Sequence, residues 1–301
     1  MKLVTYTHAG RTGIGVVRDD LVFDLGSAGA PATMVEFLEA GSAALEHARR
    51  VLAAGRGGIP LGEVQLRAPV PNPRKFLGIG GNTRSHLEEV MAAGVPIKHS
   101  PHQTWFNKQV SCISGPYDNI HMPAISEQLD YEGEMAMVIG TRCRNVKRED
   151  ALAMVAGYMA CNDVSVRDWQ LRTPTATLGK SFDTHGPTGP WIVTRDEIPD
   201  PHDLGLRTWV NGELRMDGRT DEFIHRCEDM IVELSSVFTL EPGDILSTGS
   251  PAGVGALMKP PRFLKVGDVV RVEVEGIGFI ENRVVETPPG FVFRPAAGPG
   301  A

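Results

Sequence analysis

Residues 130–139 have the sequence DYEGEMAMVI, in which acidic and apolar side chains alternate. Alternation with a period of two is typical of a β-strand, because successive side chains of a strand point to opposite faces. Asp130, Glu132 and Glu134 then share one face, while Tyr131 and the methionines on the other face suit a core. We therefore expect a strand here with two or three carboxylates on one side.

Carboxylates two residues apart on a strand repel one another unless positive charge lies among them. A bound hard cation such as Mg²⁺ would remove the repulsion, because such ions prefer oxygen ligands. A half-exposed strand with its acids in water would also remove it. The strand by itself leaves both interpretations open.

Composition narrows the class of protein. The chain has 301 residues and a net charge of −7, with 30 Lys and Arg against 37 Asp and Glu, so we expect no nucleic-acid surface. Its 34 Gly and 22 Pro favour many turns and short strands over a helical bundle. No apolar run has the length of a membrane span or signal peptide, and the four cysteines form no CxxC pair. We expect a cytoplasmic protein whose cysteines are buried or free.

Local patterns predict helices among many strands, without a steady βαβ rhythm, which indicates an α+β, β-rich fold. Asn211-Gly212 between apolar positions predicts a tight hairpin. The expected helices cover residues 34–55, 84–93, 148–157 and 221–238. The expected domains are a small N-terminal α/β cap over 1–70, a main domain over 71–286 and a Pro/Gly-rich tail over 287–301.

A second polar segment follows an apolar run at residues 158–170, YMACNDVSVRDWQ. Asp163 could supply a third carboxylate to a cation, and Arg167 and Gln170 could supply hydrogen-bond donors. A surface turn with an ordinary Asp and Arg would give the same pattern.

His86 and Glu89 lie three residues apart in a predicted helix, so their side chains can meet. A histidine oriented by a carboxylate is a suitable general base near neutral pH. An exposed helix with unremarkable charges is the alternative interpretation.

Several motifs in one order resemble the fumarylacetoacetate hydrolase family. They are Glu132-x-Glu134 followed by Asp163, then GKSFD at 179–183, PTGP at 187–190, Asn211-Gly212, and LEPGDILSTGSPAGVG at 240–255. The resemblance covers roughly residues 70–285. It implies mixed β-sheets rolled around the site, a homodimer, and Mg²⁺, Mn²⁺ or Ca²⁺ held by Glu132, Glu134 and Asp163.

The resemblance also assigns roles around that ion. His86 and Glu89 become the base that activates water, and Lys180 becomes a cation that stabilises developing negative charge. The residues expected to contact substrate are Arg167, Gln170, Thr248 and Ser250, with Lys108 and Arg84 as candidates for binding its carboxylate.

From these roles we expect metal-dependent hydrolysis of a C–C bond in a small acylpyruvate-type 2-oxo acid such as fumarylpyruvate. Decarboxylation, isomerisation or hydration of a related 2-oxo acid, as by an oxaloacetate decarboxylase, is the alternative within the family. A cation-stabilised scaffold without catalysis is the alternative of another class, and an intact His86–Glu89 pair counts against it.

Overall fold

The acidic stretch forms two strands rather than one in the computed structural model, which describes residues 1–26, 29, 31–94 and 101–290. β10 (Leu129–Asp130) ends before Tyr131, and β11 (Gly133–Ile139) begins after Glu132. Every residue of β11 is buried, so the half-exposed surface strand is excluded. β11 is buried on both faces because it lies inside the largest sheet, between two hydrophobic clusters.

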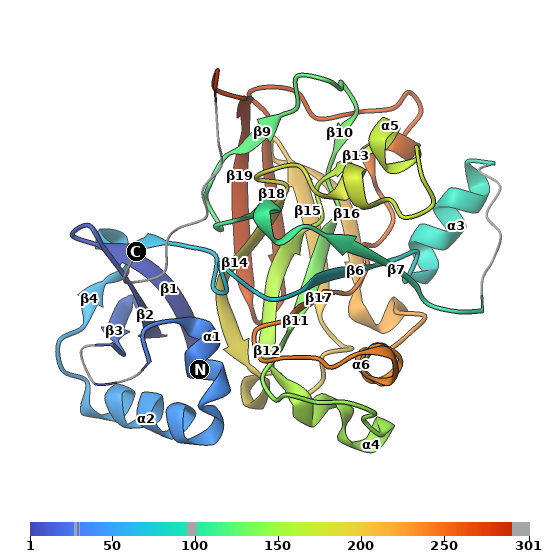
Figure 1. Cartoon of the computed structure of the whole chain (residues 1–301). Helices are drawn as coiled ribbons and strands as arrows, with labels where there is room; N and C mark the ends of the chain where they lie inside the picture. The colour runs from blue at the N-terminus through green and yellow to red at the C-terminus, as the bar shows by residue number, and fades with distance from the viewer. Residues whose placement is uncertain (27–28, 30, 95–100, 291–301) are drawn as a thin grey trace.

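That sheet has the strand order β4-β3-β2-β1-β14-β12-β11-β17-β6-β7, with β5 on β1 and β8 on β14. Figure 1 shows it running from the N-terminal strands into the middle of the molecule. Its remaining strands are β1 (Lys2–His8), β2 (Arg11–Arg18), β3 (Leu21–Asp24), β4 (Ile59–Pro60), β5 (Gln65–Leu66), β6 (Phe76–Gly80), β7 (Thr104–Lys108), β8 (Ile113–Ser114), β12 (Val155–Asn162), β14 (Gly186–Thr194) and β17 (Ile245–Ser247).

A second sheet of five strands has the order β16-β15-β18-β19-β9, and β15 and β18 contact β11 and β12 of the first sheet. A short pair, β10 and β13 (Ser165–Val166), lies apart from both. The strands of the second sheet are β9 (Ile120–Met122), β15 (Gly205–Val210), β16 (Glu213–Arg219), β18 (Val269–Val274) and β19 (Gly278–Glu286).

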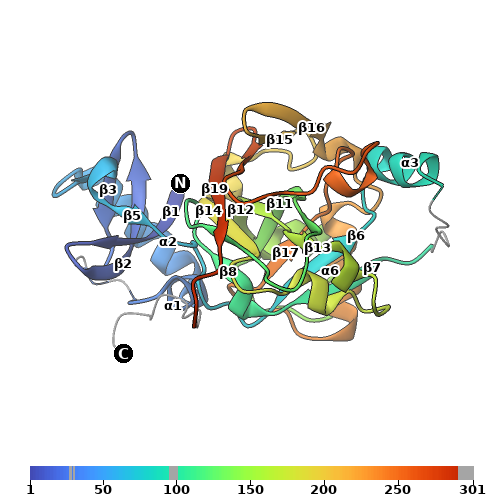
Figure 2. The ribbon, with the colours of Figure 1, turned by 90° about the horizontal axis from the view of Figure 1, so that it is seen from above.

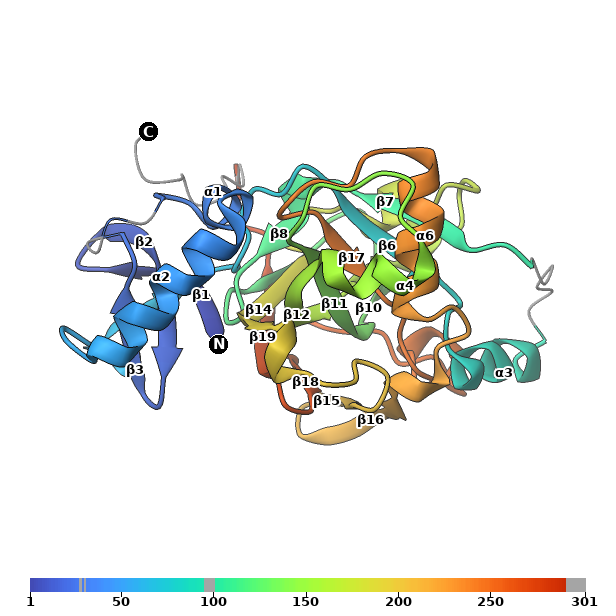
Figure 3. The same ribbon diagram turned by 90° about the horizontal axis from the view of Figure 1, so that it is seen from below.

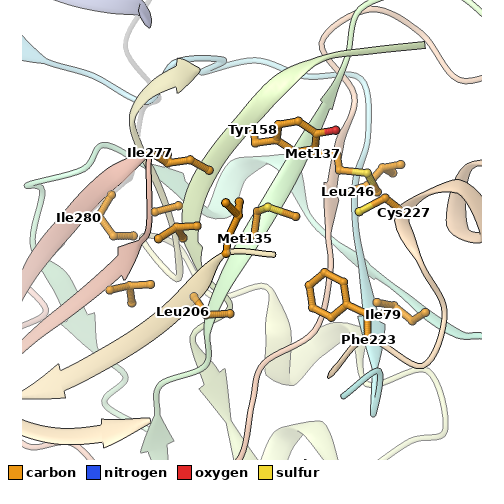
Figure 4. Close-up of a cluster of buried hydrophobic side chains, with 14 of the residues drawn as sticks. Ile79, Met135, Met137, Tyr158, Leu206, Phe223, Cys227, Leu246, Ile277 and Ile280 are labelled. Carbon is orange, nitrogen blue, oxygen red and sulfur yellow. The ribbon is translucent and has the colours of Figure 1, made fainter. Parts of the chain in front are cut away.

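The main hydrophobic core fills the space between these sheets. Met135 and Met137 of β11, Tyr158 of β12, and Leu206 of β15 point into it (Figure 4). The other face of β11 contributes Ala136 and Val138 to a second cluster shared with the N-terminal elements. The two faces of β11 therefore pack against two different hydrophobic clusters.

The helices lie around the sheets. Figures 2 and 3 show α1 and α2 with the N-terminal strands to one side, and α3 at the opposite end of the molecule. They are α1 (Met34–Glu39), α2 (Gly41–Ala54), α3 (Arg84–Ala92), α4 (Arg148–Ala151), α5 (Arg167–Gln170) and α6 (Cys227–Val237). No helix in the described ranges is both long and apolar enough to cross a membrane.

Most local predictions are confirmed, including the α+β class. The hairpin between β15 and β16 turns at Asn211 and Gly212, which have φ of 52° and 78°, as a type I′ turn requires. All four cysteines are free and buried. The helix predicted over 148–157 is wrong in its second half, because β12 begins at Val155 and pairs with β11. Cross-strand pairing there outweighs the local helical pattern.

The N-terminal strands share the main sheet, since β1 pairs antiparallel with β14. A domain boundary at residue 70 stays a prediction. Of the predicted tail, residues 291–301 lie outside the described residues.

Candidate metal centre and active site

The antiparallel pairing of β11 with β12 gathers the three predicted ligands. Gly133 is opposite Asn162, so Glu132 and Glu134 at the start of β11 meet Asp163, which follows the end of β12. The Asp163 amide donates to the Glu132 carbonyl at 2.8 Å. One ligand oxygen from each of the three carboxylates lies within 4.8 Å of the others, and all three residues are buried.

Three buried cations surround two of these carboxylates. Lys180, at the end of a short 3₁₀ helix (Thr177–Lys180), donates to Oε2 of Glu132 at 2.7 Å and to Oδ2 of Asp163 at 2.6 Å. Lys108 donates to Oδ1 of Asp163 at 2.6 Å. Arg167 donates to Oε1 of Glu132 at 2.5 Å. Burial alone would raise the pKa of Glu132, but Lys180, Arg167 and His86 lower it below its ordinary value.

Glu134 differs from the other two, because it forms no ion pair with any described residue. Its Oε2 accepts hydrogen bonds from the Ser247 hydroxyl and, at 2.8 Å, from the Gly249 amide. Burial, with the nearby charges of Asp163 and Glu132, raises its pKa to about 8. A cation bound beside Glu134 would favour its ionised form.

A hard divalent cation fits this set of groups. All three groups offer carboxylate oxygens, which such ions prefer, and they converge from two adjacent strand ends. A carboxylate oxygen that accepts one hydrogen bond keeps a further lone pair for a metal. Glu132, Glu134 and Asp163 therefore form a divalent metal site.

His86 and Glu89 meet on α3 as predicted from their spacing. Nδ1 of His86 lies 3.1 Å from Oε2 of Glu89, whose Oε1 accepts a hydrogen bond from the Gly253 amide at 2.9 Å. Thr83 caps the helix, since its hydroxyl accepts from the His86 amide and donates to the Ser250 carbonyl at 2.6 Å. Thr83 and Glu89 thus hold α3 against the loop after β17, and the Gly249 amide of that loop donates to the metal ligand Glu134.

The other predicted residues divide into two groups. Arg167, Lys108 and Lys180 belong to the buried cluster, and Gln170 adjoins it, with Oε1 accepting from Arg167 at 3.0 Å. Arg84 lies outside the cluster, because its side chain donates to the Asp221 carbonyl at 2.9 Å in an exposed contact. Its role in binding the substrate carboxylate stays a prediction.

The two hydroxyl residues lie in the loop after β17. The Thr248 hydroxyl donates to the Met135 carbonyl at 2.7 Å. Its proton therefore holds the loop against β11 and is not available to donate to a ligand. Ser250 is buried, and its carbonyl anchors Thr83.

Two residues of the site carry no predicted role. Ser247 ends β17 and donates to Glu134; it lies within the motif at 240–255, but a single serine at a strand end does not by itself predict this contact. Asp130 faces Arg167 rather than the metal ligands, with its Oδ2 2.8 Å from Nη2. The break in the strand between Asp130 and Gly133 separates it from them, and alternation alone could not reveal that break.

The family model described as Fumarylacetoacetate (FAA) hydrolase C-terminal matches residues 75–285. The chain belongs to the fumarylacetoacetate hydrolase family. The mitochondrial oxaloacetate tautomerase Fahd2a of Rattus norvegicus is 46% identical over 256 residues, which cover 85% of this chain and 80% of the relative. The mitochondrial oxaloacetate tautomerase FAHD2A of Homo sapiens is 44% identical over 257 residues, with the same two shares.

Solved structures of this family share the fold. A fumarylacetoacetate hydrolase from psychrophilic Exiguobacterium antarcticum is 37% identical with a TM-score of 0.83, covering 95% of this chain and 100% of its own. A maleylpyruvate hydrolase from Sphingobium sp. SYK-6, in complex with manganese(II) and pyruvate, is 32% identical with a TM-score of 0.79, covering 96% and 100%. The expected fold is confirmed; the homodimer and the cytoplasmic location stay predictions.

Proposed function

We propose that this chain catalyses the metal-dependent keto–enol tautomerisation of oxaloacetate or a closely related 2-oxo dicarboxylic acid. The observation that carries the proposal is the position of His86, which Glu89 holds through one ring nitrogen. Glu89 is itself bound by the loop after β17, and the same loop binds the metal ligand Glu134. The oxaloacetate tautomerases at 44–46% identity support tautomerisation over the hydrolysis expected from the sequence.

The reaction needs one proton to move from C3 of the oxo acid to the oxygen on C2. Because Nδ1 of His86 is held by Glu89, Nε2 is the nitrogen that accepts the C3 proton. The positive charge of Lys180 stabilises the enolate oxygen that forms. His86 then delivers the proton to the oxygen on C2. The C3–H bond is thus replaced by an O–H bond, and the atomic composition of the substrate does not change.

Glu132, Glu134 and Asp163 would hold a divalent ion, for which we propose Mg²⁺ or Mn²⁺. When bound, such an ion supplies Lewis acidity and a template for the 2-oxo and carboxylate oxygens of the substrate. The cluster contains four carboxylates, counting Asp130, and three cations (Lys108, Arg167 and Lys180). With all four carboxyl groups ionised, the cluster has a formal charge of −1, and a divalent ion would bring it to +1, which suits an anionic substrate.

Hydrolysis of a C–C bond is the second candidate, and the maleylpyruvate hydrolase of the same fold supports it. In that reaction His86 would take a proton from water, and the resulting hydroxide would attack the distal carbonyl. The bond between the attacked carbon and C3 would then break, releasing a carboxylic acid and the enolate of pyruvate. Decarboxylation and hydration of a related acid remain alternatives from the sequence.

An assay with two substrates separates these candidates. The decay of the ultraviolet absorbance of enol-oxaloacetate should accelerate with enzyme and Mg²⁺ and return to the spontaneous rate with EDTA. An acylpyruvate panel, with products identified by chromatography, is run in parallel. Release of pyruvate and a carboxylic acid without acceleration of tautomerisation would favour hydrolysis and contradict the proposal.

A further inference from the structure

Asp130 is a fully buried acid beside the metal centre and takes no part in the proposed proton transfer. Its Oδ1 accepts hydrogen bonds from the Tyr131 amide at 3.0 Å and the Gly255 amide at 2.9 Å. Its Oδ2 accepts from the Ala256 amide and from Nε of Arg167, both at 2.9 Å. Three backbone amides thus fix this carboxylate rigidly, and its remaining partner is Arg167.

Glycine is required where the loop approaches Asp130. A Cβ on Gly255 would lie 2.7 Å from Oδ1 of Asp130 and 2.3 Å from the Arg262 carbonyl. The absence of a side chain therefore lets the Gly255 amide reach the carboxylate. This close approach ties Asp130 to the loop that follows β17.

Arg167 connects this fixed carboxylate to a metal ligand. Its Nε and Nη2 face Oδ2 of Asp130, whereas Nη1 donates to Oε1 of Glu132 at 2.5 Å. A planar guanidinium held on one edge has little freedom to turn on the other. The direction from which Arg167 reaches Glu132 is therefore set by Asp130.

We propose that Asp130 is a positioning residue for the metal ligand Glu132 and acts through Arg167. With both charges of the Asp130–Arg167 pair present, Arg167 orients Glu132 without holding it too tightly for a metal ion. Without the charge of Asp130, the guanidinium would shift toward Glu132 and compete with the ion for its oxygens. The inference rests on the metal centre of the proposed function, but not on which reaction the enzyme catalyses.

The test is the affinity of the full chain for Mn²⁺, measured by isothermal titration calorimetry and by the electron paramagnetic resonance of free Mn²⁺. Asp130→Asn keeps the size of the side chain and removes its charge. We expect Mn²⁺ to bind about 10-fold more weakly, which is the lower end of the usual loss of metal affinity when a residue that orients a metal ligand is replaced. An affinity within about twofold of the wild-type value would overturn the proposal.

Asp244→Asn is the matched control. Asp244 is also fully buried, and it accepts from Lys75 at 2.7 Å and from the Glu241 amide at 2.8 Å, outside the cluster. We expect this variant to lower the melting temperature and leave Mn²⁺ affinity unchanged. If both variants weaken Mn²⁺ binding equally, general destabilisation accounts for the loss and the proposal is wrong.

A double-mutant cycle tests the route through Arg167. In the Arg167→Met background, Asp130→Asn should no longer weaken Mn²⁺ binding, because the guanidinium it would release is absent. A tenfold loss that persists in this background would overturn the proposal. Because the readout is metal binding, the result does not depend on the outcome of the tautomerase assay. Failure of the wild-type protein to bind Mn²⁺ would instead refute both the metal centre and the inference.

Discussion

Oε2 of Glu89 lies 3.1 Å from Nδ1 of His86 on the same helix, while Oε1 of Glu89 is held by the Gly253 amide. The carboxylate is therefore fixed on one side and orients the imidazole on the other. This arrangement predicts that His86→Ala lowers kcat by about 10²–10⁴, the usual contribution of a general base.

The same substitution should leave the Mn²⁺ affinity of the protein within about twofold, because His86 is not a ligand. Calorimetry measures this separately from turnover. The matched control for the pair is Glu88→Gln, since Glu88 is adjacent but exposed, and its turnover should equal that of the wild type. Unchanged kcat in His86→Ala would remove this residue as the base.

Asp163→Asn should abolish stabilisation by metal. Asp163 is one of three converging ligands, and its loss leaves two carboxylates for the ion. A saturating ion at about 100 times its Kd adds about 2.7 kcal/mol to the free energy of unfolding. We expect Mn²⁺ to raise the melting temperature of the wild-type protein but not of the variant. An equal rise in both would show that Asp163 is not a ligand.

Tyr131→Phe should reduce turnover without weakening metal binding. The Tyr131 hydroxyl donates at 2.9 Å to the carbonyl of Gly253, the residue whose amide holds Glu89. Loss of one hydrogen bond costs about 1 kcal/mol. If this full amount is added to the activation free energy of proton transfer by His86, kcat falls roughly fivefold. Steady-state kinetics measures the effect.

Tyr158→Phe is the control for this substitution. The Tyr158 hydroxyl is buried without a hydrogen-bond partner in the described part of the chain, so its removal should cost no stability and no activity. An identical loss of kcat in both variants would contradict the positioning role of Tyr131.

His185 should make the protein less stable in acid. Burial lowers the pKa of His185 to about 3, because the ring is fully enclosed. The contact of its Nε2 with the His121 carbonyl at 2.8 Å opposes this shift but does not outweigh it. The unfolded chain, with a pKa near 6.5, takes up a proton first as the pH falls. Stability is therefore fully present above about pH 6.5 and is lost progressively toward pH 3, by up to about 1.4 kcal/mol per pH unit.

His185→Gln keeps an N–H donor but does not titrate. Chemical denaturation at several pH values should show a shallower loss of stability in this variant between pH 6.5 and 3. Equal slopes in the two proteins would show that His185 does not contribute to acid sensitivity.

The sequence predicted the parts of the site that depend on local spacing. The His86–Glu89 pair follows from helical geometry. Strand alternation grouped Glu132 with Glu134, and the family resemblance identified them as metal ligands. The convergence of Asp163 on them follows from pairing between β11 and β12, which spacing alone does not specify.

Other features depend on contacts between distant segments. Alternation could not show that β11 is covered on both faces, because the second layer comes from the N-terminal elements. The failed helix at Val155 has the same origin, since its residues pair with β11. Arg84 illustrates the limit for side chains, because a long arginine near the site turned to Asp221 instead.

The pairing of β11 with β12 has a consequence for how this enzyme tolerates insertions. The two strands stay in uninterrupted register from Gly133 to Val138, and the irregularity lies between Val138 and Ile139, at the end remote from the ligands. An added residue near that irregularity could be absorbed as a bulge. A residue added between Ala160 and Asn162 would shift Asp163 out of register with Glu132 and Glu134. Natural variants that differ in length within these two strands should therefore carry their insertions near Val138 and Ile139, and not near the metal ligands.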